Sequence, residues 1–325
     1  MRIVLFLACL PVYACAAQLV PPPGFAKPLP HTGHGSCVTL PAPYTADLVF
    51  RSKYEGSDSA RATLNPDAEK AFRDETKPIT DFERGISQMI WRYKYTGDAK
   101  TRDCILSGFT QWANADALTS AHTNHTGRSM RKWALATLAT GWVELKFMPG
   151  SPLKENADIE RWLALLADKV VQDWDGLPLA KTNNHSYWAA WSVMAASVAL
   201  NRQDLFNWSV KEYRIAARQI EADGTLPNER KRRERAAAYH NYALQPLVMI
   251  ASFAQANGVD LLPENQYALQ RLANWVLQHD NRNAAWLAPY CTLVKCDSVT
   301  LSLRDASHSQ KNRRMGGDLT VLYQP

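Results

Sequence analysis

From about residue 64 to the end of the chain, apolar side chains recur at intervals of three and four residues. This spacing places them along one side of an α-helix. Clusters of Gly, Pro, Asn and Asp, which end helices and form turns, separate the apolar runs. Alternating runs rich in β-branched residues, which would predict strands, are almost absent. The sequence therefore predicts an all-α protein of roughly ten or more helices.

The predicted helices follow one another over about 250 residues with short connections, and short connections make neighbouring helices antiparallel. Such an array of helical hairpins predicts an α-solenoid or a closed α/α toroid. The absence of a motif repeated at a fixed period argues against a solenoid. No domain boundary is apparent after residue 40. We expect an extended arm over 18–50, a polar loop over 50–65 and the helical array over 66–325.

Residues 1–17 have the pattern of a secretory signal peptide. An apolar run at 3–10 follows a positive charge, and the tripeptide ACA at 14–16 offers a small-residue cleavage site near Ala17. A lipoprotein acylated at Cys15 is an alternative, which the bulky Tyr13 disfavours. No later segment approaches the roughly 18 uninterrupted apolar residues of a membrane span. We therefore expect an exported protein with no membrane span.

Cleavage would leave four cysteines: Cys37, Cys104, Cys291 and Cys296. An even number in an exported chain favours disulfides. Cys291 and Cys296 are close enough for a short local loop, which would leave Cys37 to pair with Cys104. Three pairings are formally possible, and the sequence does not choose among them.

The formal charge of +6 makes the protein basic. A basic exported protein suits an anionic partner, such as an acidic polysaccharide, a nucleic acid or a membrane surface, although the charge could equally serve solubility. Eleven Trp and twelve Tyr supply flat rings that could stack on sugars or bases. Exported proteins rarely meet nucleic acid, so we expect no nucleic-acid partner.

Residues 183–191 read NNHSYWAAW and open an apolar helical run. Asn183 or Asn184 can cap this helix. The start of a helix presents free N–H groups and a partial positive charge, which favours an anion such as a carboxylate. Asn184 and Trp188 share a face, and His185 is a neighbour of Trp188. The pattern predicts either a binding site or an ordinary cap followed by a buried histidine.

The segment NERKRRERAAAYHNYAL (228–244) places Arg232 and Tyr239 on one face of a predicted continuous helix. Arg is the preferred bidentate partner of a carboxylate. A Tyr beside fixed positive charge can have its phenolate favoured, which suits proton transfer. The alternative is a solvated basic face, which we expect for Lys231, Arg233 and Arg235.

Two other polar segments are candidates for substrate contact. Residues 50–65, FRSKYEGSDSARATLN, form either an exposed loop or a mobile lid in which Lys53 and Arg61 reach for negative charge and Tyr54 stacks.

The second segment is AHTNHTGRSMRKW (121–133). Its residues His122 and His125 could suit a metal ion, but no third ligand is evident nearby. A surface of donors for sugar hydroxyls, made by His125, Thr126 and Arg128, is the favoured interpretation. We expect no metal site.

The sequence lacks a GxSxG elbow, an HExxH helix, a phosphate-binding loop and a dinucleotide-binding glycine pattern. A glycoside hydrolase needs two acidic residues facing the cleaved bond. The candidate segments offer Asn, His, Arg, Tyr and Lys instead. Groups that neutralise charge and move protons, without a carboxylate pair, favour β-elimination over hydrolysis.

These segments resemble the alginate lyases that cleave polymannuronate, polysaccharide lyase family 5. The resemblance covers nearly the whole mature chain. It is carried by LVFRSKYEGSDSARATLN, NHTGRSMRKWAL, NNHSYWAAWSVM, LPNERKRRERAAAYHNYAL, WLAPYC and MGGDLT. The segment QHDNRNAAW is shorter than the corresponding segment of some relatives. The resemblance implies an incomplete (α/α) toroid with a lid loop over a central cleft, periplasmic residence, and no metal or cofactor.

The resemblance also implies roles for single residues. The catalytic residues of the family correspond to Asn184, His185, Arg232 and Tyr239. The family's substrate-contacting residues correspond to Ser52 and Lys53 in the lid, to the pair His125 and Thr126, and to Trp188, whose ring would stack on a sugar.

In the implied mechanism, Asn184, His185 and Arg232 bind the C6 carboxylate of a uronate and stabilise the charge that develops there. Tyr239 takes the C5 proton and protonates the leaving O4; alternatively His185 is the base and Tyr239 the acid. Two other functions stay open: a non-catalytic alginate-binding scaffold of the export machinery, and an inverting glycoside hydrolase on a similar toroid.

Overall fold

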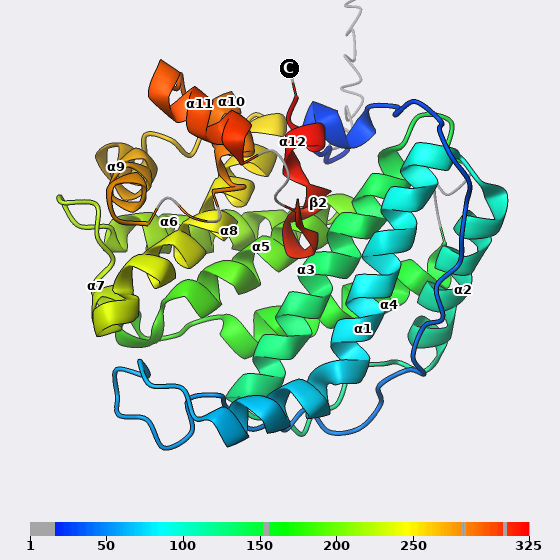
Figure 1. Ribbon diagram of the computed structural model, residues 1–325, viewed down its shortest axis with the longest axis horizontal. Helices are drawn as coiled ribbons and strands as arrows, with labels where there is room; N and C mark the ends of the chain where they lie inside the picture. The colour runs from blue at the N-terminus through cyan, green and yellow to red at the C-terminus, as the bar shows by residue number, and fades with distance from the viewer. Residues whose placement is uncertain (1–16, 152–155, 281, 283, 308–310, 325) are drawn as a thin grey trace, which may run out of the picture.

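The computed structural model describes residues 17–151, 156–280, 282, 284–307 and 311–324. The predicted signal peptide, apart from Ala17, lies outside these residues. Within them the regular structure is almost entirely helical, as predicted (Figure 1). The two strands found there, β1 (Lys311–Asn312) and β2 (Gly317–Asp318), pair antiparallel. No described helix is both long enough and apolar enough to cross a membrane.

The long helices pair into hairpins. These are α1 (Pro66–Thr96) with α2 (Ala99–Asn114), α3 (His125–Phe147) with α4 (Ala157–Trp174), α5 (Asn184–Leu200) with α6 (Gln203–Gln219), and α8 (Ala236–Ala256) with α9 (Glu264–His279). The first helices pack in sequence, α1 on α3, α3 on α5 and α5 on α8, while each second helix packs on its own partner. The result is the two-layered (α/α) toroid.

Helix α5 lies at the centre of this arrangement and packs against α3, α4, α6 and α8. From Ser186 to Ala199 every side chain is buried. The helix is apolar all round and rich in Ala and Ser, which lets neighbouring helices approach closely. Its first turn, by contrast, carries Asn184 and His185, which lie beside the loop at 50–65. The packing of the core therefore fixes the position of the residues that open α5.

The helix predicted to run continuously through Arg232 and Tyr239 is interrupted. Helix α7 (Pro227–Arg230) ends, a 3₁₀ turn (Arg233–Arg235) follows, and α8 begins at Ala236. Arg233 has a φ of 52°, which is outside the helical region. Contacts with the loop at 50–65 accompany the break: Arg233 pairs with Asp58, and Arg232 donates to the backbone oxygen of Ala60.

The N-terminal arm runs along the outside of α1 and α2 (Figure 1). It buries Phe25 and Leu48, and its first turn is a short 3₁₀ helix (Pro23–Ala26). A disulfide joins Cys37 to Cys104 on α2, and a second joins Cys291 to Cys296. Both pairings are those that the spacing favoured among the three possibilities.

The 3₁₀ turn η2 (Leu179–Lys181) leads into the start of α5 on the side of the loop at 50–65. The remaining described elements are α10 (Leu287–Leu293), α11 (Ser298–Ala306), the 3₁₀ turn η4 (Arg313–Met315) and α12 (Leu319–Leu322). Turn η4 packs against α3 and α1, which brings Arg314 towards the centre of the fold.

Candidate active site

A cleft of about 460 Å³, here called the main cleft, opens between the lid loop (residues 50–65), the starts of α3 and α5, and the segment from α7 to α8. Ten of the twelve residues predicted to contact substrate line it, and Arg128 and Trp188 do not. The ten are Ser52, Lys53, Tyr54, Arg61, His125, Thr126, Asn184, His185, Arg232 and Tyr239. The fold thus gathers side chains from four segments that are far apart in the sequence.

A second cavity of about 450 Å³, the side cleft, continues from the main cleft beneath the lid loop. Both cavities share Arg61, His125, Asn184, His185 and Arg232. These five residues therefore stand at the junction of a longer groove. A polymer could pass this junction with sugar units on either side.

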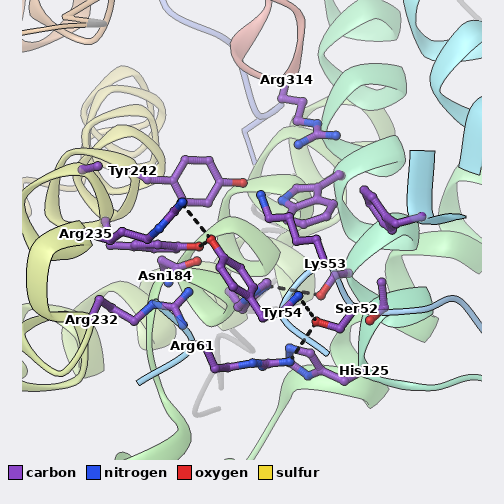
Figure 2. A pocket seen from close by; sticks show the side chains of 17 residues that line it. Ser52, Lys53, Tyr54, Arg61, His125, Asn184, Arg232, Arg235, Tyr242 and Arg314 are labelled. Carbon is purple, nitrogen blue, oxygen red and sulfur yellow. Dashed lines mark hydrogen bonds between the residues drawn. The ribbon is translucent and has the colours of Figure 1, made fainter. Parts of the chain in front are cut away.

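The main cleft is basic. Lys53, Arg61, Arg232, Arg235 and Arg314 line it, and none of its described lining residues is Asp or Glu. In Figure 2, Lys53, Tyr54 and Arg232 converge on one space, with His125 and Arg314 at opposite ends of the view. A cleft with low-dielectric walls and charge of one sign concentrates anionic ligands. The main cleft therefore provides no carboxylate pair for glycoside hydrolysis. The two acids that line the side cleft already have partners, since Glu229 binds Asn184 and Asp173 pairs with Arg131.

Tyr239 lines the main cleft. The guanidinium of Arg232 lies over its ring, 3.8 Å from the centroid, although the two residues do not share a continuous helix. The hydroxyl groups of Tyr239 and Tyr54 are 2.5 Å apart, and Arg235 donates to Tyr54. The lid loop thus contacts the proposed acid–base residue directly.

The expectation of a favoured phenolate at Tyr239 is wrong for the free protein. Burial raises the pKa of Tyr239, the hydrogen bond with Tyr54 raises it further, and Arg232 lowers it only in part. In the absence of ligand, Tyr239 is therefore a neutral phenol. A substrate that displaces Tyr54 would remove one of the two causes of the raised pKa.

His185 lies in a shell of rings and cations. Its ring is 4.9 Å from that of His125 and is stacked on Trp174. Burial lowers the pKa of His185 well below its usual value, and Lys132 lowers it further. The same two causes lower the pKa of His125 to about 4. Both imidazoles are therefore neutral near pH 7.

The start of α5 is already occupied by a carboxylate from within the protein. Glu229 accepts hydrogen bonds from the backbone N–H of Asn184, at 2.7 Å, and from its side-chain Nδ2. Asn183, as predicted for one of the two asparagines, is the N-cap and accepts from His185. In this structure a carboxylate of the protein itself occupies the helix start, where the sequence had suggested a substrate carboxylate.

Oδ1 of Asn184 and Nε of Arg232 belong to the set of buried polar atoms that have no hydrogen-bond partner among the described residues. Unpaired buried polar atoms are costly and mark sites where a ligand is expected to bind. Arg232 Nε can donate to an anion, whereas the Asn184 oxygen can only accept. The two residues thus offer complementary contacts to one ligand.

Trp188 does not occupy the place predicted for it. Its side chain is only 1% exposed, it does not line the cleft, and its Nε1 donates to the backbone oxygen of Tyr242. The ring of Tyr242 stacks on it and faces the main cleft instead. Trp188 therefore supports the wall of the cleft from behind, because α5 buries that face completely.

Several residues of the site escaped the sequence analysis. Arg235, expected on a solvated face, reaches the cleft because the break before α8 turns it inward. Lys231, from the same expected face, lines the side cleft, while Arg233 is exposed as expected. Glu229 was overlooked at the start of a basic run that contains one other acid, Glu234. The available signal was an acid next to a run of cations.

Lys132 was overlooked too. The signal that could have found it is a cation at the start of the apolar run of α3.

Among the described residues there is no cluster of three or more His, Cys, Asp or Glu that could hold a metal ion. His122 contacts Asp47 at the surface, away from the main cleft.

Residues 49–286 match the family described as "Alginate lyase". The chain is 52% identical to an alginate lyase of Pseudomonas syringae pv. syringae over 95% of its own length and 90% of that protein. It is 51% identical to an alginate lyase of Cobetia marina over 95% and 91%. This chain belongs to the alginate lyase family.

Solved structures of family members share the fold. Alginate lyase A1-III from Sphingomonas species A1 superposes with a TM-score of 0.71 at 22% identity, covering 93% of this chain and 90% of that one. A variant of alginate lyase A1-III with a bound tetrasaccharide gives a TM-score of 0.75 at 22% identity, over 95% and 92%. At this identity the likeness supports the toroidal architecture alone.

Proposed function

We propose that this protein is a periplasmic lyase that cleaves the 1,4-glycosidic bonds of alginate, at mannuronate residues, by β-elimination. The observation that carries the proposal is the meeting of Tyr239, His185 and Arg232 in one basic cleft without a carboxylate pair. The names of the curated relatives support alginate as the anionic polysaccharide.

The first requirement of the reaction is to acidify the C5 proton of a uronate. Removing this proton places negative charge on the C6 carboxylate, and preorganised donors at that position lower the barrier. Arg232 has a free, buried Nε and therefore suits the carboxylate. His185 lies beside it at the junction of the two clefts, and Asn184 contributes an acceptor for a sugar hydroxyl.

The second requirement is proton transfer. In mannuronate, the C5 hydrogen and the C4 oxygen lie on the same side of the ring, so one group can serve both. Tyr239 is a neutral phenol in the free protein, so it first loses its own proton to solvent when substrate binds. The phenolate then removes the C5 proton, the C4–O4 bond breaks as the C4–C5 double bond forms, and the phenol so formed protonates the leaving O4. The products are a shortened chain and an unsaturated uronate at the new non-reducing end. Lys53, Ser52, His125 and Thr126 would hold the flanking sugars.

The two other candidate functions fit less well. An inverting hydrolase would need an acid pair, and the described lining of the main cleft contains none. A non-catalytic scaffold of the export machinery would need only the basic groove. The contact of the half-buried Arg232 with the Tyr239 ring goes beyond what binding requires, because Arg232 lowers the pKa of the phenol. Components of the alginate export machinery are partners that a periplasmic lyase could have.

The test is the ultraviolet absorbance of the unsaturated uronate when the protein acts on polymannuronate. Tyr239→Phe and His185→Ala should each reduce the rate by about 10²- to 10⁴-fold. Tyr267→Phe is the matched control, because it removes the same hydroxyl from an exposed ring outside the cleft. Near-wild-type rates in both site variants would contradict the assignment.

Product analysis on defined mannuronate and guluronate blocks tests the proposed preference for mannuronate. Cell fractionation tests the proposed periplasmic location.

A further inference from the structure

A buried lysine lies directly behind His185. The side chain of Lys132, on α3, is fully buried, and its Nζ is 2.9 Å from Nδ1 of His185. It has no ion pair with a carboxylate among the described residues: the nearby Asp173 pairs with Arg131 instead. A buried cation without an anionic partner is costly, so its retention calls for a specific role.

The surroundings of Lys132 suit an amine that donates a hydrogen bond to His185. The Nζ lies 4.1 Å from the ring centroid of Trp174 and 4.6 Å from that of Trp133. The faces of Trp rings attract an ammonium group. They cannot accept all of its hydrogens, and the nitrogen of His185 is the strong acceptor within reach.

We propose that Lys132 is a positioning residue: by donating to Nδ1, it holds His185 in the neutral tautomer whose proton is on Nε2. A neutral imidazole has one donor nitrogen and one acceptor nitrogen, so a donor at Nδ1 fixes the proton on the other. His185 lines both clefts, and Nε2 has no partner among the described residues. His185 then meets the substrate as a hydrogen-bond donor and not as a base.

The charges on neighbouring elements act in the same direction. Lys132, His125, Arg232 and Arg61 all oppose a second proton on His185. Burial and Arg314 lower the pKa of Lys132, and Asp173 partly offsets them. Either protonation state of the amine can still donate to Nδ1. Ser129 Oγ, 3.2 Å from the same nitrogen, is the other group that could set the tautomer.

This inference deepens the proposed function, since it leaves proton abstraction to Tyr239 and charge stabilisation to His185. It can be tested without substrate. In the ¹⁵N-labelled full-length protein, nitrogen chemical shifts distinguish protonated Nδ1 from protonated Nε2. We expect His185 to carry its proton on Nε2 at about pH 7 and above. A wild-type spectrum with protonated Nδ1 would overturn the inference, whatever the lyase activity.

Lys132→Met tests the cause, because Met fills a similar volume and cannot donate. In the folded variant, we expect the tautomer preference to be lost and kcat on polymannuronate to fall about 100-fold or more, with a smaller change in KM. Ser129→Ala is the matched control and should keep the Nε2 tautomer. If Lys132→Met kept that tautomer and Ser129→Ala lost it, Lys132 would have no positioning role. Absent activity with the expected tautomer would instead contradict the proposed function alone.

Discussion

Glu229 holds Asn184 by three hydrogen bonds, one from the backbone N–H and two from the side-chain amide. Because both oxygens of the carboxylate face the amide, Nδ2 must point towards Glu229 and Oδ1 away from it. An acid that is 1% exposed thereby determines which atom of Asn184 is available to a ligand. The partial positive charge at the start of α5 and the nearby Arg232 favour the anionic form of Glu229, although burial raises its pKa.

Replacing Glu229 with Gln should therefore impair both folding and catalysis. Gln presents one oxygen and one amide group where the carboxylate presents two oxygens, so at least one hydrogen bond from Asn184 is lost. We expect the free energy of unfolding to fall by about 1–3 kcal/mol and the lyase rate to fall about 100-fold. Urea unfolding and the absorbance assay measure the two effects.

The control for that substitution is Glu234→Gln, which makes the same chemical change on an exposed residue of the following 3₁₀ turn. It should change the free energy of unfolding by less than about 0.5 kcal/mol. Equal effects of the two substitutions would show that the net charge, and not the contact with Asn184, is what matters.

The contact between the lid and Tyr239 predicts a shift in the pH profile. Tyr239 donates its hydroxyl proton to Tyr54, and this hydrogen bond raises the pKa of Tyr239, so Tyr54→Phe should lower it. A base acts when it is deprotonated, so activity rises with pH through the pKa of that base. Lowering the pKa therefore moves the rising limb of kcat/KM to lower pH. An unchanged limb in Tyr54→Phe would indicate that Tyr239 does not act as the base.

Gly127 in the first turn of α3 marks the junction of the arm, the lid and the site. A Cβ at this position would lie 1.7 Å from the backbone oxygen of Leu48, which is in the arm. Gly127→Ala should therefore force these segments apart and destabilise the protein by about 1–3 kcal/mol. The helical propensity of Ala would offset at most about 1 kcal/mol of this loss.

Gly141 supplies the comparison, because it lies on the same helix and its added Cβ would meet only the end of the flexible Ile90 side chain. Gly141→Ala should be tolerated far better than Gly127→Ala in urea unfolding. Similar urea midpoints of unfolding for the two variants would show that the arm can move away from Gly127 at Leu48 at little cost in free energy.

The two disulfides should contribute unequally to stability. The bond from Cys37 to Cys104 spans 67 residues, and that from Cys291 to Cys296 spans 5. The entropy of the unfolded chain predicts a stabilisation of about 4 kcal/mol for the first and about 2 kcal/mol for the second. Unfolding of the two Cys→Ala double variants under oxidising conditions measures both. A larger loss from the shorter loop would contradict this order.

Much of the fold followed from local patterns. Helical periodicity and turn residues predicted the hairpins, and Asn65 and Gly97 mark the ends of α1 as cap and left-handed terminator. The identities of Asn184, His185, Arg232 and Tyr239 as cleft residues were likewise predicted, through motifs that resemble a family. The prediction that Arg232 and Tyr239 share one face of a continuous helix was wrong. The two side chains are nevertheless in contact, because tertiary contacts bring them together across the break before α8.

The sequence by itself determined the helices, because the period of apolar residues is a local property that each segment carries alone. It also determined the basic character of the segments that became the cleft. Only the tertiary structure decided that Glu229 occupies the start of α5, that Lys132 lies behind His185, and that Trp188 is hidden behind Tyr242. Those relationships join residues up to 54 positions apart, and the contacts of such residues depend on how whole helices pack.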